Sequence, residues 1–161
     1  MKRYFLFLLH FFFTIAPLTA QIDLKIPDWV NKIEPKPVSI NKKDVVDGYY
    51  YALIDEQYNS IAKQYYFHYA QAIVNEEALT TISQIEFSYD PTFQKPKLHF
   101  IKIIRGTTII DKTKNLDFKI LNEESQRKVG LLDGRKTFYT NLSYVRKGDI
   151  IEFAFFIDGK N

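Results

Sequence analysis

The chain has 161 residues, which is enough for one ordinary domain and short for two. It contains no cysteine, which excludes a thiol nucleophile, a thiolate metal site and a lipid anchor attached through an N-terminal cysteine. Twenty-two basic residues stand against 19 acidic ones, and without the two basic residues of the leader, Lys2 and Arg3, the balance is 20 against 19. Such a balance gives no argument for a nucleic-acid partner.

Residues 1–20 have the three-part plan of a secretory signal peptide. Two basic residues open the segment, Tyr4–Ile15 is almost wholly apolar, and Ala20 is a small residue before Gln21. The alternative is an uncleaved membrane anchor, but the apolar run is shorter than the roughly 20 residues that span a bilayer as a helix. We therefore expect export to the periplasm or cell envelope, no lipoprotein anchor, and no stable membrane insertion after cleavage.

Residues 21–47 form a lead-in with scattered charge and no sustained hydrophobic period. Pro27, Pro35 and Pro37 favour extended or loop conformations because proline fixes φ and removes a hydrogen-bond donor. Trp29 is the only tryptophan. We expect Trp29 to anchor the lead-in to the domain, and the alternative is that its ring stacks against a ligand.

Residues 48–161 have the pattern of a mostly β domain. Ile85, Phe87 and Tyr89 alternate with polar residues, which is the period of a strand with one solvated face. The segment 62–74 is aromatic enough for a strand, although its alanines would also suit a helix. Seven or eight short strands are typical of an antiparallel β-sandwich or a barrel-like domain. The expected strands cover residues 49–54, 62–74, 82–89, 97–105, 107–110, 116–120, 137–145 and 150–157.

Turn residues separate these runs. Gly106 follows one strand directly and predicts a hairpin, because glycine adopts positive φ without steric cost. Asp133-Gly134 predicts another turn. In the turn at Arg146–Asp149 we expect Gly148 at positive φ and a side chain of Asp149 that accepts backbone N–H bonds. Residues 122–129 are charged and predict a short helix or a loop.

The aromatic content offers one candidate binding surface. Tyr65 and Tyr66 are our candidate binding residues in a tyrosine-rich stretch that could stack against a glycan or a peptide. Ordinary sandwich packing is the favoured alternative for these rings. Arg105 and Arg146 are two further candidates, which could face a shared groove and bind a carboxylate, and structural ion pairing is the favoured alternative for them.

No catalytic set is evident in the sequence. His68 and His99 each lie in an expected strand without a close histidine neighbour, so we expect partly buried sheet histidines and no metal site. The acidic pairs are adjacent residues, which point to opposite faces of a strand and do not form a dyad. Nucleophile elbows, phosphate loops and zinc-protease motifs are missing. We therefore expect no catalytic residues, no cofactor and no enzyme activity.

Four segments in order carry a family resemblance: residues 85–94, 98–106, 132–134 and 145–153. Together they resemble the domain of unknown function that precedes transglutaminase-like domains in exported Bacteroidetes proteins. The resemblance implies a β-sandwich module before a papain-like transglutaminase or protease domain. The catalytic Cys, His and Asp of that neighbour would lie downstream, and no position of this chain matches them.

The end of the chain departs from that family pattern. Members run on through an Asn-Pro and further strands, whereas this sequence stops at Asn161. We therefore expect a sandwich that is incomplete at its C-terminus, from a fragment or a truncated product, with the apolar strand at 150–157 lacking a neighbour. Such an edge is a pairing liability and leaves self-association open.

These observations favour a non-catalytic exported β-sandwich module, accessory to a transglutaminase-like or papain-like domain in a longer chain or a partner. The alternative is a free-standing periplasmic protein that binds a glycan or a peptide through its tyrosine-rich face.

Overall fold

The computed structural model describes residues 21–22, 25–35, 42–114, 116–122 and 134–159. The strands are β1 (Gln21–Ile22), β2 (Tyr49–Asn59), β3 (Gln64–Ile73), β4 (Gln84–Tyr89), β5 (Gln94–Arg105), β6 (Thr108–Asp111), β7 (Lys119–Asn122), β8 (Lys136–Asn141) and β9 (Ile150–Gly159). The helical segments are η1 (Lys42–Asp44), η2 (Glu76–Ala78) and α1 (Leu79–Ile82).

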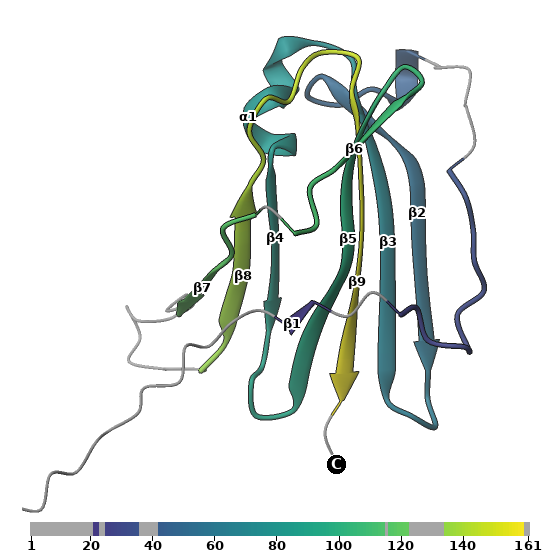
Figure 1. The fold of residues 1–161 in the computed structure, drawn as a ribbon, viewed down its shortest axis with the longest axis vertical. Coiled ribbons are helices and arrows are strands. Elements are labelled where there is room, and N and C mark those ends of the chain that lie inside the picture. Colours follow the sequence, from purple (N-terminus) through teal and green to yellow (C-terminus); the bar gives the residue numbers. More distant parts are fainter. Residues whose placement is uncertain (1–20, 23–24, 36–41, 115, 123–133, 160–161) are drawn as a thin grey trace, which may run out of the picture.

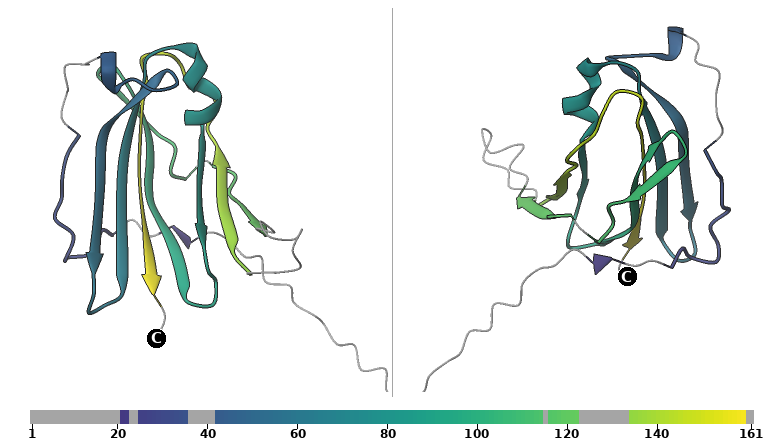
Figure 2. Two further views of the ribbon diagram at one scale, coloured as in Figure 1. Left: turned by 180° about the vertical axis from the view of Figure 1, so that it is seen from behind. Right: turned by 45° about the horizontal axis from the view of Figure 1, so that its top comes forward.

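The strands form two sheets (Figure 1). The six-stranded sheet has the order β1-β5-β9-β3-β2, with β6 also paired to β5, and the three-stranded sheet has the order β4-β8-β7. Every pairing between these strands is antiparallel except that of β1 with β5. Figure 2 shows β4, β7 and β8 as a layer separate from the larger sheet. The predicted mostly antiparallel β fold is confirmed.

The main core lies where the two sheets meet. Phe155 of β9 stacks on Phe87 of β4 with ring centroids 4.1 Å apart, so the two sheets are in direct contact. Strand β9 supplies its odd-numbered residues to this core and its even-numbered residues to the opposite face, because successive strand side chains alternate. The buried members of the core are Ile73, Ala78, Ile82, Ile85, Leu98, Ile101, Ile103, Leu142, Ile151, Phe153, Phe155 and Ile157.

The lead-in covers the other face of the larger sheet. Trp29 packs there against a buried cluster that contains Val30, Tyr66 and Phe156. The indole Nε1 of Trp29 also donates a hydrogen bond of 2.7 Å to Oε1 of Gln64 in β3. The prediction that Trp29 anchors the lead-in to the domain is confirmed, and this part of the lead-in belongs to the folded unit.

The expected free edge at the last strand is wrong. Strand β9 lies between β5 and β3 and pairs with both along its length. Its apolar residues are buried because both faces of the larger sheet are covered at this central position. Self-association through this strand therefore loses its structural basis.

Most predicted strands differ from the structure in their bounds. Strand β2 runs on to Asn59 beyond its predicted end at residue 54, and β4 begins at Gln84 because Leu79–Ile82 forms α1. Residues 116–118 lie outside β7, and the carbonyl of Asp117 accepts a hydrogen bond from the Thr140 hydroxyl in place of a ladder N–H. Strand β8 ends at Asn141 because Tyr144 adopts a left-handed φ of 66° and its carbonyl accepts a hydrogen bond from Arg105.

Several local predictions agree with the structure. The segment 64–73 is a strand, and β5 and β6 form a hairpin around Gly106 at φ 57°. Gly148 has φ 86°, and Asp149 accepts the backbone N–H of Arg146 at 2.8 Å. The leader at 1–20, the charged segment at 123–129 and Asp133 lie outside the described residues.

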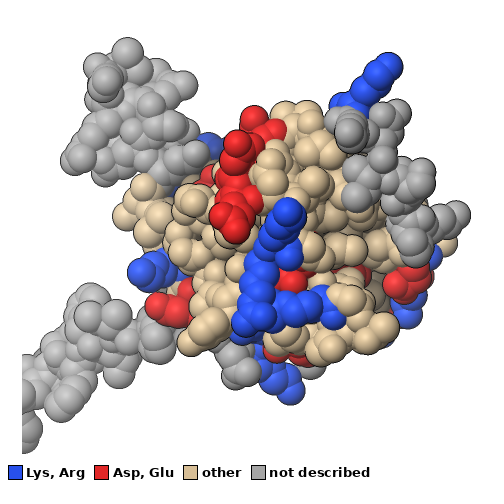
Figure 3. Space-filling model, turned by 90° about the horizontal axis from the view of Figure 1, so that it is seen from above, with Lys and Arg blue, Asp and Glu red and all other residues tan. Residues whose placement is uncertain are grey.

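The surface charge is mixed. Seen from the end that carries α1, lysine and arginine side chains lie beside acidic ones (Figure 3). Within the described ranges, we find no helix with the length and apolar character needed to cross a bilayer.

Candidate functional site

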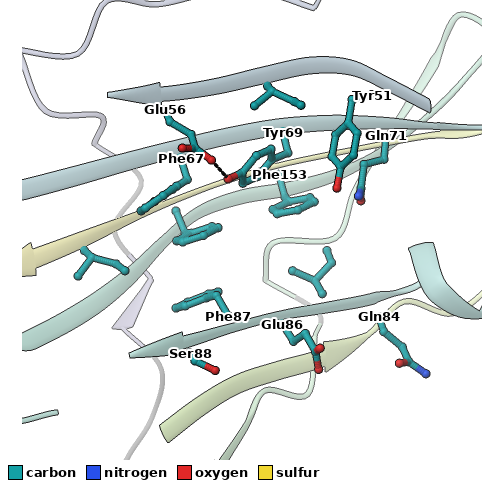
Figure 4. A pocket seen from close by; sticks show the side chains of 14 residues that line it. Tyr51, Glu56, Phe67, Tyr69, Gln71, Gln84, Glu86, Phe87, Ser88 and Phe153 are labelled. Carbon is teal, nitrogen blue, oxygen red and sulfur yellow. Dashed lines mark hydrogen bonds between the residues drawn. The ribbon is translucent and has the colours of Figure 1, made fainter. Parts of the chain in front are cut away.

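A groove of about 570 Å³ opens between the two sheets (Figure 4). This volume lies within the usual range of ligand-binding clefts. Strands β2, β3 and β9 line one side, and β4 lines the other. The lining residues are Tyr51, Ile54, Glu56, Phe67, Tyr69, Gln71, Gln84, Ile85, Glu86, Phe87, Ser88, Phe153, Phe155 and Ile157.

The wall on the larger sheet is aromatic. Phe67 of β3 stacks on Phe155 of β9 with ring centroids 4.8 Å apart, and the ring centroids of Tyr69 and Phe153 are 5.6 Å apart. The antiparallel register sets these neighbours, since Phe67 pairs with Phe155 and Tyr69 with Phe153 across the ladder. Cross-strand aromatic pairs of this kind stabilise a sheet and leave a firm apolar surface.

Glu56 adds a carboxylate to the aromatic wall. Glu56 of β2 accepts a hydrogen bond from the hydroxyl of Tyr69. Burial, and then this hydrogen bond, raise the pKa of Tyr69, so the hydroxyl stays protonated and remains a donor. The bond holds the Glu56 carboxylate against the wall of the groove.

The opposite wall is the backbone edge of β4. Residues 84–88 all line the groove, although successive side chains of a strand point to opposite faces. A groove can meet both sets of side chains only if it runs along the edge of the strand. In the part of the chain that the structure describes, β4 pairs with β8 alone.

The register of β4 with β8 identifies which backbone groups point into the groove. Leu142 donates its backbone N–H to the Ser83 carbonyl at 2.8 Å, and the pairing continues without a shift through Tyr89. Hydrogen-bonded and non-hydrogen-bonded pairs alternate along an antiparallel ladder. The backbone N–H and C=O groups of Gln84, Glu86 and Ser88 therefore point away from β8, toward the groove.

The groove carries acidic groups only. Its lining residues include Glu56 and Glu86 and no lysine, arginine or histidine. The groove therefore favours a ligand with a cationic group over an anionic one.

A second, smaller cavity of about 250 Å³ lies beneath the lead-in. It contains His68, whose Nε2 lies 2.9 Å from Oε1 of Glu152, and both side chains are buried. Tyr66 lines the same cavity, and burial, followed by the charges of Asp55 and Glu152, raises its pKa to about 12. Among the described residues no group of three or more metal-ligating side chains is found.

The predicted tyrosine pair is split between the two faces. Tyr65 is exposed and stacks on Tyr58 with ring centroids 4.3 Å apart. Tyr66 points to the opposite face, where it is 3% exposed under the lead-in. The structure therefore does not bring the two rings into one surface, since adjacent residues of a strand point to opposite sides.

The predicted arginine pair meets at a carboxylate of the protein itself. Arg105 donates from Nε and Nη2 to the two carboxylate oxygens of Asp149, both at 2.8 Å. Arg146 contributes its backbone N–H to the same carboxylate. Structural ion pairing, the alternative that we favoured, is confirmed for Arg105.

Sequence reasoning included Tyr69 in the tyrosine-rich stretch but missed the groove itself, with Glu56 and the edge of β4. The alternation at Ile85 and Phe87 showed which face of β4 is buried, but the alternation is the same for a central strand and an edge strand. Only the strand order reveals that this edge opens onto β2 and β3.

Comparisons with known proteins agree with this architecture. Residues 59–161 match the family described as a domain of unknown function with a solved structure, DUF3857. No curated protein matches the chain. A crystal structure of a proposed protease from Parabacteroides distasonis has a similar fold, with a TM-score of 0.60 and 16% sequence identity. The similarity covers 72% of this chain and 24% of that chain.

The present chain thus corresponds to about a quarter of that solved protein. The family match extends over more than half of the chain and includes every strand from β3 to β9. The chain therefore belongs to the DUF3857 family of domains of unknown function.

Proposed function

We propose that this chain is an exported, non-catalytic β-sandwich module that is accessory to a transglutaminase-like or papain-like domain, in a longer chain or in a partner. The groove between the sheets carries the proposal. It combines an aromatic wall with the backbone edge of β4, and features of both kinds can bind a polypeptide without reacting with it.

The size of the similar protease supports this role. The present fold is similar to about a quarter of that chain, which leaves most of the protein for other domains. A module of this kind can hold a polypeptide beside a separate catalytic centre, which lowers the cost of orienting the substrate.

The native polypeptide provides the test. We would isolate it from the cell-envelope fraction and measure its mass and its N-terminal sequence. The expected product begins near Gln21 and either continues into a domain with a catalytic cysteine and histidine or co-purifies with one. A product that stays in the cytoplasm, or one that ends at Asn161 and purifies alone, would contradict the proposal.

One observation favours a second function, glycan binding by a free-standing protein. Tyr58 and Tyr65 are stacked and exposed beside Phe67 of the groove, and exposed tyrosine rings suit sugars as well as peptides. Tyr65→Ala and Tyr58→Ala should each weaken binding to envelope oligosaccharides in an NMR titration. Unchanged binding in both variants would exclude this surface.

A further inference from the structure

We propose that the groove binds an extended polypeptide segment of another protein, which adds as a strand to the edge of β4 that faces away from β8. This proposal deepens the proposed function, since it names what the accessory module recognises. The binding itself can be tested without any catalytic domain.

The edge of β4 supplies the backbone contacts. Gln84, Glu86 and Ser88 present their N–H and C=O groups to the groove, as the register with β8 requires. An added strand would hydrogen-bond to this row, which is how exposed sheet edges bind peptides. Six residues of β4 extend over roughly 20 Å at about 3.4 Å per residue, so the edge suits a segment of five to seven residues.

The aromatic wall selects the side chains. A strand added to β4 would lie over β3, whose Phe67 and Tyr69 line the groove. Every second side chain of the added strand would face this wall. Apolar residues at alternate positions therefore bury their surface there, and the intervening residues face solvent.

Glu56 favours a basic residue at one of the peptide positions whose side chains face the aromatic wall. Its carboxylate accepts the Tyr69 hydroxyl, and an ionised carboxylate has about four acceptor positions. Because the lining residues include no basic side chain, a lysine or arginine of the bound segment can pair with this carboxylate. The expected ligand is thus an extended segment with alternating apolar residues and one basic residue.

Strand geometry also predicts which peptide N–H groups matter. We expect antiparallel pairing, the more stable arrangement per residue. The peptide residues directly opposite Gln84, Glu86 and Ser88 then donate their backbone N–H groups to β4. The side chains of these peptide residues point away from the aromatic wall, as those of Gln84, Glu86 and Ser88 do in Figure 4. The groove-facing residues of the peptide direct their own N–H groups away from β4.

The probe is the capped peptide Thr-Val-Thr-Lys-Thr-Val-Thr, titrated into the protein from Gln21 onward and followed by amide NMR. Binding should slow hydrogen exchange at Gln84, Glu86 and Ser88, while the amides of Ile85 and Phe87, already bonded to β8, should change little. N-methylation of the threonines should weaken binding at least tenfold, because it removes several backbone hydrogen bonds. N-methylation of the valines and the lysine should weaken it less than threefold.

Two protein variants separate the backbone and charge contributions. Glu86→Pro removes a groove-facing N–H, and edge strands tolerate proline where the N–H points outward, so binding should fall at least fivefold with the fold intact. Glu86→Gln loses the same carboxylate but keeps the N–H, so the loss in Glu86→Pro is measured against this variant. Glu56→Gln should weaken binding of the lysine peptide about fivefold and leave a peptide with valine at that position unchanged.

Three results would overturn the proposal. They are absence of binding by the lysine peptide, equal losses for the two N-methylated peptides, and β4 amides that are already protected in the full native protein by a segment of its own chain. The proposed accessory function has a separate test in the native polypeptide. A failed peptide titration with a longer native product would reject only the strand-addition proposal.

Discussion

At the scale of single residues, the Asp149 carboxylate organises the turn between β8 and β9. Its residue is 1% exposed, and it receives two hydrogen bonds from Arg105 and one from the backbone of Arg146. Burial alone would raise the pKa of Asp149, but these bonds outweigh burial and lower it. The same pairing raises the pKa of Arg105.

Asp149→Asn should lower the free energy of unfolding at pH 7, because it removes the buried carboxylate that accepts hydrogen bonds from Arg105 and from the backbone N–H of Arg146. The pKa of Asp149 is lower in the folded than in the unfolded state, so its contribution is present above the unfolded value near 4 and is lost as pH falls through the folded value. Urea denaturation at several pH values measures this difference.

The gap between wild type and Asp149→Asn should therefore narrow below about pH 4. Glu86→Gln serves as the control, since Glu86 is exposed and its replacement should change stability little. A gap that is equally wide at pH 2 and pH 7 would contradict the ion-pair explanation.

Two glycines with positive φ allow backbone strain to be separated from crowding. Gly48 has φ 83°, and a Cβ there would lie 2.0 Å from Oδ1 of Asn75, whereas Gly134 has φ 67° and open space around it. Gly134→Ala should cost about 1 kcal/mol from strain alone. Gly48→Ala should cost roughly 2–4 kcal/mol, because the Asn75 cap of η2 must also move. Thermal unfolding of both variants tests this, and equal costs would show that crowding is unimportant.

At the scale of elements, the lead-in acts as a cover for the outer face of the larger sheet. Residues 25–35 include Trp29 and Val30, which pack on Tyr66 and Phe156. This cover explains why the polar side chains of His68 and Glu152 lie buried on a sheet face that would otherwise meet solvent.

Trp29→Ala should remove this cover and lower the free energy of unfolding by about 3 kcal/mol. It should also lower the pKa of Tyr66 from about 12 toward its ordinary value, because burial is the largest cause of the shift. Alkaline ultraviolet titration reports this change, and Asp28→Asn, at an exposed lead-in position, is the control. An unchanged Tyr66 titration would show that the lead-in does not bury the ring.

The sequence predicts elements well where alternation is strict. Strands β4, β5 and β9 follow directly from alternating or continuous apolar residues. The helical turns at 76–82 were not predicted, since their seven residues are too few to show a helical period. The candidate site could not be predicted either. Strand order decides which edge is free, and the groove unites Glu56 with residues of β4 and β9 that are distant in the chain.

At the scale of the whole molecule, the two sheets differ in width and in cover. Strands β9 and β5 are central in the larger sheet, with packed clusters on both faces, whereas β2 and β4 each end a sheet. Exposed apolar side chains gather where the smaller sheet stops short: Tyr51, Ile54, Tyr58 and Tyr65. The stability of the fold should therefore be uneven, with the smaller sheet held mainly by its contacts with the larger one.

Phe87→Ala tests this coupling, because Phe87 contacts both Phe155 of the larger sheet and Phe138 of its own sheet. We expect a loss of about 2 kcal/mol, with faster hydrogen exchange in β4 and β8 than in β3 and β9. The amide hydrogens of the central strands exchange only when the whole protein unfolds. Their protection should therefore fall only by the loss in the free energy of global unfolding. Phe93→Ala, at a position 62% exposed, is the control. Equal acceleration in both sheets would mean that the molecule opens as one cooperative unit, and the groove could then widen only by unfolding.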